Sequence, residues 1–303
     1  MAEKTSNHVA VNHRYTREMG YGRRRPFLFF VGGLPRSGTT WVMHLLDAHP
    51  RLCCIGEAGF FNFLANRLGE VFSSYNTFAG PQNDRKMMPV KGFDGLSSRR
   101  VFETAIVEII RANTPKDLRQ LEGLGEKTPD NLMCLKALWN NVPDARFIHI
   151  IRDCRDVAVS GWERFQPNLD NWSSRSDYAA DMAGAWRGRI EKARRLAAEQ
   201  PPQLYHELRY EDLLAGPHDE AAKLFKFLTV ADDKQTVETA VAATRFEKLS
   251  GGRKNGEADQ SDSRAHFRKG VSGEWRVEFS AEENSRVWQA AGPLLDDLGY
   301  AKT

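Results

Sequence analysis

A short apolar run, Phe27 to Val31, leads directly into a glycine-rich segment, Gly33 to Thr40, which reads GLPRSGTT. After this segment, apolar side chains recur at the spacing of one helix face: Trp41, Val42, Leu45 and Leu46. A strand, a tight loop and a helix in this order can direct the free backbone N–H groups of the first helical turn at an anion. The sequence therefore predicts a loop that binds a phosphate-like group, although a turn that only joins strand to helix has the same pattern.

Four further stretches have the composition of strands: Leu52 to Ile55, about Leu121 to Gly125, Arg146 to Ile151, and Leu204 to Leu208. Helical patterns fall at about residues 99–112, 175–198, 217–228, 233–243 and 281–297. Uninterrupted apolar strands that alternate with helices are typical of a parallel sheet covered on both faces. We therefore predict an α/β fold, a single-domain parallel sheet flanked by helices, whose ligands bind at the carboxyl ends of the strands.

Composition limits the class of protein. The 303 residues are 41% hydrophobic and 27% charged, as in a globular chain, and the formal net charge of +3 is too small to indicate a nucleic-acid partner. No apolar run reaches the ~20 residues of a membrane span. The four cysteines have neither a disulfide framework nor metal-ligand spacing, so a cytoplasmic location is expected. We reject an export signal at Arg24 and Arg25 because no small-residue cleavage site follows them.

The polar residues 1–25 are predicted to form a flexible N-terminal arm, which leaves residues 26–303 as one folded domain. Two stretches rich in glycine and small polar residues, Ser73 to Gly95 and Ser250 to Ser263, are predicted to be long loops. Loops of this length in a compact domain often cover a site or contact a substrate.

The glycine-rich segment differs from the loop of nucleotide triphosphatases. Those loops place a lysine directly after the last glycine, whereas here Thr39 follows Gly38 and the nearest cation is Arg36. The spacing of the glycines fits a phosphate-binding loop, but the position of the cation does not fit a kinase.

A second predicted anion site follows the fourth apolar strand. Arg152 lies at the end of that strand, and Asp153 is predicted to cap the next helix. Ser160 then lies about two helical turns from Arg152, so that both side chains can bind one phosphate. The alternative is a capped helix that carries Arg155 and Asp156 in exposed ion pairs.

Both motifs resemble those of the sulfotransferase family. Residues 35–41, PRSGTTW, resemble its 5′-phosphosulfate-binding loop, and residues 151–160, IRDCRDVAVS, resemble its 3′-phosphate-binding motif. The resemblance implies a P-loop nucleotide-kinase-like sulfotransferase fold with 3′-phosphoadenosine-5′-phosphosulfate (PAPS) as the donor. It implies that the donor contacts Arg36, Ser37, Gly38, Thr39, Thr40, Trp41, Arg152 and Ser160. Cytosolic members usually have lysine at the position of Arg36, whereas tyrosylprotein and many bacterial members have arginine.

Three segments of the second half extend the resemblance. Tyr210 begins YEDL, and Thr244 and Phe246 lie in TRFEKL; both segments resemble elements that hold the adenine of the donor. Stacking of a base on an aromatic ring contributes about 1 to 3 kcal/mol, although Phe246 in ordinary core packing has the same pattern. Residues 268–275, RKGVSGEW, resemble the RKGxxGxW motif that closes over the 3′-phosphate, which implies donor contacts from Arg268, Lys269 and Gly270.

Sulfuryl transfer requires in-line positioning of the reactants, a base for the acceptor proton, and cations beside the leaving phosphate. Arg36 is one predicted cation, and Lys127, in the segment EKTP after an apolar strand, is the other. No metal is required, because a sulfuryl group carries less charge than a phosphoryl group.

A base for the acceptor proton completes the predicted site. Cytosolic family members use a histidine near the position that Pro129 occupies here, so that histidine is absent. Glu57 resembles the glutamate that serves as base in tyrosylprotein and some bacterial members, and it is the predicted base. The alternatives are that Glu57 is a structural acid paired with an arginine, or that His44 or His49 is the base.

The sequence thus predicts an enzyme that transfers a sulfuryl group from PAPS to a hydroxyl or amine of a small-molecule, carbohydrate or peptidyl acceptor. The alternatives are a P-loop kinase of a small alcohol and a non-catalytic nucleotide-binding protein. Phe60, Phe61 and Phe63 could line an acceptor pocket or pack in the core. The oligomeric state stays open, because Arg276 to Ser285 do not match the KxxxTVxxxE contact pattern of cytosolic members.

Overall fold

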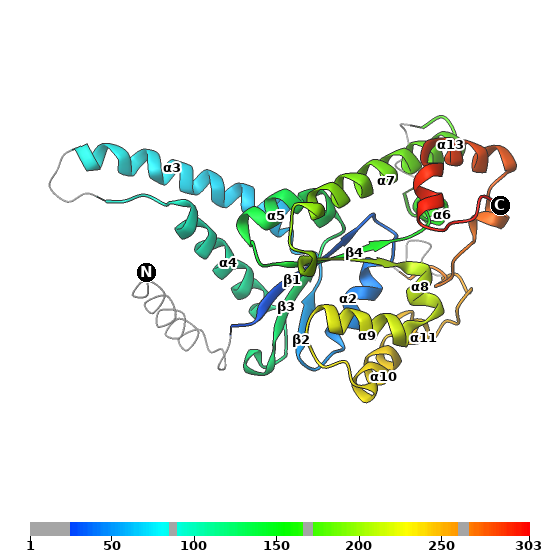
Figure 1. Cartoon of the computed structure of the whole chain (residues 1–303), viewed down its shortest axis with the longest axis horizontal. Helices are drawn as coiled ribbons and strands as arrows, with labels where there is room; N and C mark the ends of the chain where they lie inside the picture. The colour runs from blue at the N-terminus through cyan, green and yellow to red at the C-terminus, as the bar shows by residue number, and fades with distance from the viewer. Residues whose placement is uncertain (1–24, 85–89, 166–171, 260–266) are drawn as a thin grey trace.

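The described part of the chain folds around one sheet of five parallel strands, as the sequence predicted (Figure 1). The computed structural model describes residues 25–84, 90–165, 172–259 and 267–303. The strands are β1 (Phe27–Gly33), β2 (Leu52–Ile55), β3 (Gly123–Lys127), β4 (Arg146–Ile151) and β5 (Tyr205–Arg209). Their order across the sheet is β2-β3-β1-β4-β5, so β1 lies in the centre and pairs with β3 on one side and β4 on the other.

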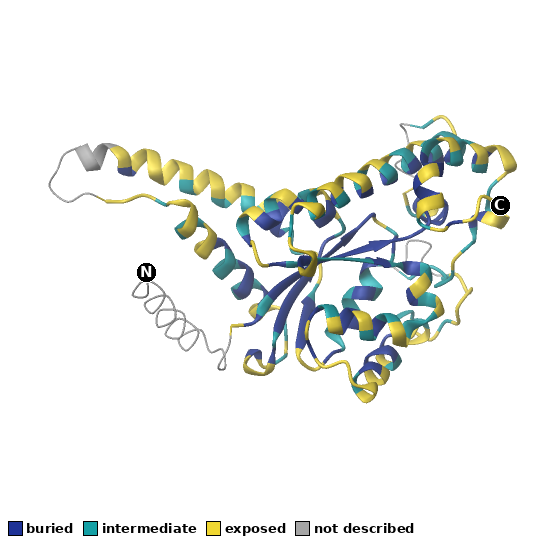
Figure 2. Ribbon diagram, in the orientation of Figure 1, coloured by how far each residue is buried: buried dark blue, intermediate teal, exposed yellow. Residues whose placement is uncertain are grey.

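Helices cover both faces of the sheet (Figure 2). One face packs on α4 (Gly95–Ala112), α5 (Leu135–Asn141), α6 (Cys154–Phe165), α7 (Arg175–Ala198) and α13 (Ala281–Asp297). The other face packs on α2 (Thr39–Asp47), α8 (Tyr210–Ala215), α9 (Pro217–Phe227) and α10 (Lys234–Ala243). Successive residues of a strand point to opposite faces, so Phe29 and Phe30 enter different core clusters. A strand buried on both faces therefore needs the continuous apolar run seen in the sequence.

Short helical segments connect these elements. They are η1 (Phe60–Leu64), η2 (Leu118–Gln120), η3 (Pro129–Cys134), η5 (Pro202–Leu204), α11 (Phe246–Leu249) and α12 (Trp275–Glu278). The predicted helices 175–198 and 281–297 match α7 and α13, and two others match α9 and α10 to within one residue. The helix predicted at 99–112 begins earlier, at Gly95, because Asp94 and Ser97 form a capping box at its start.

The long loop predicted for Ser73 to Gly95 is wrong over its first half. Helix α3 (Ala65–Asp84) passes through this stretch and extends away from the sheet beside α4 (Figure 1). Apolar side chains recur along it at helical spacing: Leu68, Val71, Tyr75 and Phe78. This spacing, with few β-branched residues, outweighs the glycines and asparagines on which the loop prediction relied. Residues 85–89 of the stretch lie outside the described residues.

The third strand lies two residues later than predicted, at Gly123–Lys127 instead of Leu121 to Gly125. Leu121 directly follows the turn of η2, whose carbonyl at Leu118 accepts a hydrogen bond from the Leu121 N–H. Glu126 and Lys127 are both buried in β3 because each has polar partners, which hydropathy alone does not reveal.

Residues 1–24 of the predicted arm, and residues 260–263 of the second predicted loop, lie outside the described residues. Arg25 is described, and it donates to Glu103 of α4 at 2.6 Å. Across the described ranges of the chain, no helix combines the length and apolarity needed to cross a bilayer.

Candidate active site

A cavity of about 580 Å³ lies at the carboxyl ends of the strands, within the size range of small-molecule sites. Fourteen of the sixteen predicted site residues line it: Arg36, Gly38, Thr39, Thr40, Trp41, Glu57, Arg152, Ser160, Tyr210, Thr244, Phe246, Arg268, Lys269 and Gly270. The other two, Ser37 and Lys127, are buried directly behind the lining residues. The fold thus brings together residues that are more than 200 positions apart in the sequence.

The glycine-rich loop turns sharply between β1 and α2. Arg36 and Gly38 both have left-handed backbone conformations, with φ of 74° and 95°. A Cβ atom on Gly38 would lie 2.6 Å from Cδ2 of Tyr210, so the ring requires glycine at this position. The hydroxyl of Ser37 is buried and has no hydrogen-bond partner among the described residues. A strained loop with an unpaired donor at a helix start is suited to an anion.

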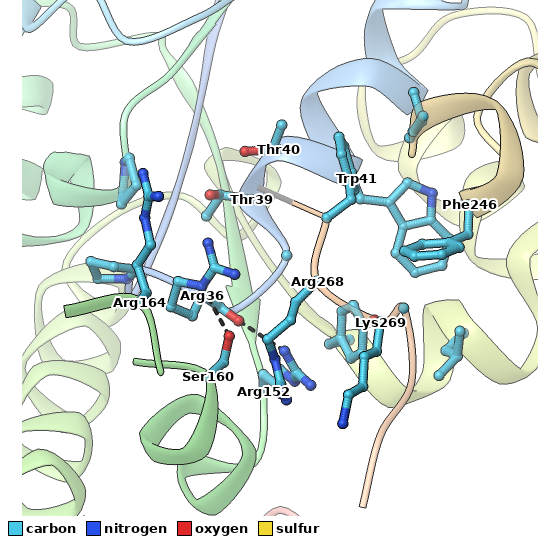
Figure 3. A pocket seen from close by; sticks show the side chains of 18 of the residues that line it. Arg36, Thr39, Thr40, Trp41, Arg152, Ser160, Arg164, Phe246, Arg268 and Lys269 are labelled. Atoms are coloured by element: carbon cyan, nitrogen blue, oxygen red, sulfur yellow. Dashed lines mark hydrogen bonds between the residues drawn. The ribbon is translucent and has the colours of Figure 1, made fainter. Parts of the chain in front are cut away.

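Four arginines gather around the cavity: Arg36, Arg152, Arg164 and Arg268 (Figure 3). Burial first, and then the charges of the other three arginines, together lower the pKa of Arg36 to about 10. The Nε of Arg36 donates to Ser160 Oγ at 2.9 Å, which orients the guanidinium. Clustered like charges favour a polyanionic ligand, since its binding removes their mutual repulsion.

Arg164 was missed by the sequence interpretation. It lies four residues after Ser160 on α6, so both side chains project from one face of the helix. That spacing is the one sequence signal that could have identified it.

Arg152 contacts both the glycine-rich loop and the segment after Gly270. Its guanidinium donates to the Arg36 carbonyl at 3.1 Å and to the Val271 carbonyl at 2.9 Å. It also lies 4.5 Å from the centre of the Tyr210 ring, in cation–π contact. Its buried Nε has no partner in the described part of the chain. A fixed guanidinium with one donor to spare is suited to a phosphate oxygen.

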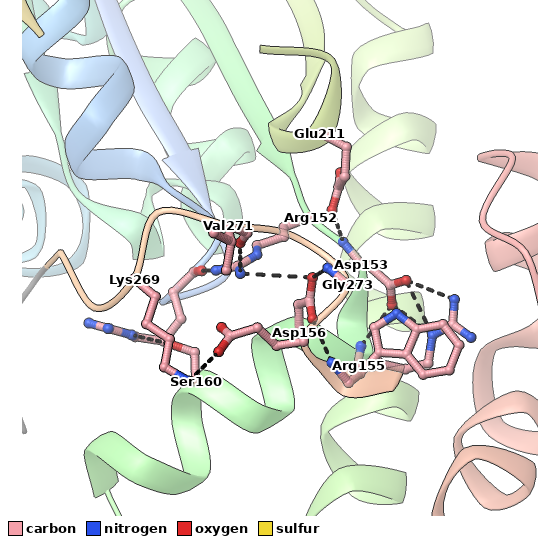
Figure 4. A network of polar contacts seen from close by, with 12 residues as sticks. Arg152, Asp153, Arg155, Asp156, Ser160, Glu211, Lys269, Val271 and Gly273 are labelled. Carbon is pink, nitrogen blue, oxygen red and sulfur yellow. Dashed lines mark hydrogen bonds and ion pairs between the residues drawn. The ribbon is translucent and has the colours of Figure 1, made fainter. Parts of the chain in front are cut away.

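Asp153 caps α6 as predicted, but the alternative of exposed ion pairs is wrong (Figure 4). Asp153 accepts from the Arg155 N–H at 2.9 Å and pairs with its guanidinium, and Arg155 and Asp156 are 0% and 1% exposed. Asp156 accepts from the backbone N–H groups of Gly273 at 2.6 Å and Trp275 at 3.1 Å. The buried carboxylate therefore ties the start of α6 to the segment after Gly270.

Residues 267–270 are fixed by a second segment, 253–256. Arg253 donates to the carbonyls of Phe267 at 2.6 Å and Arg268 at 2.7 Å. Next along, the Lys269 carbonyl accepts from the Gly256 N–H at 2.7 Å, and the Gly270 carbonyl accepts from the Asn255 side chain at 2.9 Å. The side chains of Arg268 and Lys269 both pair with Glu274.

At the opposite edge of the cavity, Lys127 Nζ donates to Glu57 Oε1 at 2.7 Å. The Lys127 side chain is 5% exposed, whereas the Glu57 side chain is 53% exposed and faces the cavity. Glu57 thus pairs with a lysine and not with an arginine. A half-exposed carboxylate beside a buried ammonium can take a proton from a substrate in the cavity.

Neither histidine considered as a base lines the cavity. His49 is fully buried against the ring of Phe225, and its Nε2 lies 2.9 Å from the Ala231 carbonyl. Burial lowers the pKa of both His44 and His49, which disfavours their charged forms.

The three phenylalanines considered for the acceptor do not line the cavity either. Phe60 and Phe61 are buried in the core, as the packing alternative predicted, and Phe63 is 63% exposed. Asn62, Pro129, Asp130 and Phe165 line the cavity instead. Within the described ranges, no group of three His, Cys, Asp or Glu side chains has metal-binding geometry.

This cavity has a phosphate-binding loop after the central strand and a carboxylate at the opposite edge. These features are typical of a group-transfer enzyme with a phosphorylated donor. The comparison with known families makes the class more specific. The model of the sulfotransferase family matches residues 26–234, so the chain belongs to this family. It is therefore an enzyme that transfers a sulfuryl group.

Relatives of known name agree with this family. A putative protein-tyrosine sulfotransferase of Caenorhabditis briggsae is 27% identical, over 90% of this chain and 89% of its own. Sulfotransferase 1A1 of Canis lupus familiaris is also 27% identical, over 92% of this chain and 83% of its own. Mouse sulfotransferase SULT7A1, solved with PAP, has the same fold, with a TM-score of 0.55 and 16% identity over 92% of this chain and 90% of its own.

Proposed function

We propose that the chain transfers a sulfuryl group from PAPS to a hydroxyl or amine acceptor and releases 3′-phosphoadenosine-5′-phosphate (PAP), with Glu57 as the base. The observation that carries this proposal is that Glu57 and the phosphate-binding loop line one cavity, with Lys127 Nζ 2.7 Å from Glu57. A base, a cation and an anion site then lie within reach of one reacting group.

The lining residues fit a nucleotide with phosphates at two positions. The loop amides with Arg36, Thr39 and Thr40 would bind the 5′ end of the donor. Arg152, Ser160, Arg268 and Lys269 would bind its 3′-phosphate, and Trp41, Tyr210, Thr244 and Phe246 would hold the adenine. The unpaired buried atoms Ser37 Oγ and Arg152 Nε support this assignment. A buried donor without a partner costs about 1 to 3 kcal/mol, and a phosphate oxygen would remove that cost.

Each proposed residue has a defined part in the transfer. Glu57 accepts the acceptor's proton while the acceptor oxygen or nitrogen forms a bond to sulfur. Arg36 and Lys127 neutralise the charge that develops on the 5′-phosphate oxygen as its bond to sulfur breaks. Lys127 would leave its ion pair with Glu57 as the leaving group becomes charged, and Glu57 would then hold the proton. The electron pair of the broken bond stays on the PAP that is released.

The exposure of Glu57 supports an acceptor that reaches the base from solvent. Half-exposed Glu57 lines the same cavity as Asn62 and Asp130, so the acceptor group would approach from solvent past polar side chains. The name of the nematode relative places tyrosyl hydroxyls first among the acceptors to screen. We further propose a cytoplasmic location, which the four unpaired cysteines support: Cys53, Cys54, Cys134 and Cys154.

Calorimetric titration with PAP and with ATP tests the donor assignment. Tighter binding of PAP is expected, because ATP has no 3′-phosphate for Arg152 and Arg268. Tighter binding of ATP would contradict the proposal and favour a kinase. Incubation with sulfur-labelled PAPS and a panel of phenols, sugars, steroids, alcohols and tyrosyl peptides then tests transfer. Binding of PAP without transfer to any acceptor would favour the non-catalytic alternative.

A further inference from the structure

A fully buried carboxylate lies behind the proposed base. Glu126 is 0% exposed, lies in β3 next to Lys127, and does not line the cavity. Its two oxygens accept three hydrogen bonds, one from the segment after β2 and two from the start of η3. Burying a carboxylate is costly unless it is hydrogen-bonded, so its partners indicate what the fold gains from it.

One of the three donors belongs to the segment that carries the base. Glu126 Oε1 accepts from the backbone N–H of Ala58 at 2.9 Å. This N–H is part of the peptide bond that follows Glu57, so the hydrogen bond fixes the backbone immediately after the base. The other oxygen accepts from the Asn131 side chain at 2.8 Å, and the Thr128 hydroxyl also donates to Oε1. The Asn131 amide in turn lies 3.3 Å from the carbonyl of Val31 in β1.

The segment around the base needs this support. It reads Gly56-Glu57-Ala58-Gly59, and Gly59 has a left-handed conformation with φ of 64°. Two glycines within four residues give the chain considerable freedom. Strand β2 ends at Ile55, which is paired with Glu126, and among the described residues the sheet pairing does not continue beyond it. The Ala58 N–H bond to Glu126 replaces the sheet as the restraint.

Glu57 is therefore held from two sides by neighbouring residues of one strand. Lys127 binds its carboxylate, and Glu126 binds the peptide behind it. We propose that Glu126 is a positioning residue, which holds the peptide after Glu57 so that the base faces the acceptor. This inference rests on the proposed function, because it assumes that Glu57 is the base.

The test uses Glu126→Gln in the full chain, since glutamine keeps the size of the side chain but removes one acceptor. Its new amide N–H₂ faces the Asn131 amide, so the network must rearrange and the hold on Ala58 weakens. We expect kcat to fall about tenfold, because small displacements of a catalytic group cost up to ~10²-fold. The Kd for PAP should stay within about twofold of wild type, because Glu126 is outside the cavity.

A double-mutant cycle separates positioning from a general loss of structure. If Glu126 acts through Glu57, adding Glu126→Gln to Glu57→Ala should lower turnover no further. Glu283→Gln is the matched control, since Glu283 is also buried, at 7% exposed, and pairs with Arg175 away from the cavity. It should lower stability without lowering kcat. Additive losses in the double mutant, or a loss of PAP affinity in Glu126→Gln, would overturn the proposal.

Two further outcomes of these measurements separate the positioning role of Glu126 from the base assignment of Glu57. If Glu126→Gln does not fold, Glu126→Asp is measured in the same cycle, and the same non-additivity is required of it. If Glu57→Ala keeps wild-type turnover, the base assignment fails, and that result does not depend on any Glu126 variant. Failure of the positioning role and failure of the proposed base are thus distinguishable.

Discussion

Arg253 donates from one side of its guanidinium to the carbonyl of Arg268 at 2.7 Å, although the two residues are 15 positions apart. The other side of the fork donates to Phe267 at 2.6 Å, and the guanidinium carbon lies 5.5 Å from the centre of the Phe246 ring. Arg253 lies outside every motif recognised in the sequence. It nevertheless fixes the segment that carries two proposed phosphate ligands, Arg268 and Lys269. It also contacts Phe246, which is proposed to hold the adenine of PAPS.

Replacement of Arg253 with alanine should weaken PAP binding about tenfold. The carbonyls of Phe267 and Arg268 would lose their donors, and Arg268 and Lys269 would lose their fixed positions. Adenosine 5′-phosphate lacks the 3′-phosphate, so its affinity should change less, and isothermal titration of both nucleotides measures the difference. Arg253→Lys keeps the charge but not the fork, so it should behave like alanine. Wild-type PAP affinity in either variant would show that the contact is dispensable.

Glu57→Ala should lower turnover by about 10²-fold and leave PAP affinity nearly unchanged, because a general base acts on the acceptor and not on the donor. Single-turnover assays with labelled PAPS, combined with PAP titration, separate the two effects. Glu70→Gln, an exposed acid on α3, serves as the control for loss of a surface charge. Unchanged turnover in Glu57→Ala would remove Glu57 from the mechanism.

Arg164→Ala should weaken PAP binding by about tenfold or more, since a hydrogen bond to a charged group contributes about 1.5 to 3 kcal/mol. The position of Arg164 in the cavity and its effect on the pKa of Arg36 are the basis for this expectation. Arg187→Ala is the matched control, because Arg187 lies on α7 in a long surface ion pair with Glu191 at 3.9 Å. Equal PAP affinities for the two variants would exclude Arg164 from the donor site.

The parts of the site that the sequence predicted are those encoded by local patterns. The loop from Gly33 to Thr40 and the strand end at Arg152 each follow a buried strand, so parallel pairing alone brings them to one edge of the sheet. Helix α3 was missed because glycine and asparagine were weighted above the apolar spacing of Leu68, Val71 and Tyr75. The sequence of α3 thus contains both loop-forming residues and helical apolar spacing, and the apolar spacing determines the structure.

Other features could not be read from the sequence in principle. Glu126 gains its importance from the N–H of Ala58, which lies in the segment after β2, and no pattern near Glu126 encodes that contact. Arg155 was considered an exposed residue of an ion pair, yet it is buried 3.5 Å from the centre of the Trp275 ring. Contacts between segments 68 and 120 residues apart depend on the whole packing, which periodicity does not describe.

Histidine 149 gives a prediction for stability. His149 is 1% exposed in β4, its Nδ1 lies 2.6 Å from the Tyr205 hydroxyl, and burial lowers its pKa to about 4. The nearby charges of Glu207 and Arg194 act in opposite directions on this pKa. Because the unfolded chain binds the proton near pH 6.5 and the folded chain near pH 4, the stability from a neutral His149 is complete above about pH 6.5. It is lost progressively as the pH falls towards 4.

Between about pH 7.5 and pH 5.5, this one group should lower the free energy of unfolding by roughly 1 to 2 kcal/mol. Urea unfolding of wild type and His149→Asn at both pH values isolates its contribution, since asparagine can still form a hydrogen bond with the Tyr205 hydroxyl and does not titrate. Burial also lowers the pKa of His44, His49 and His206, but these residues are present in both proteins and cancel in the difference. The variant should therefore lose less stability on acidification than wild type. Equal losses in both proteins would mean that His149 takes up its proton without unfolding.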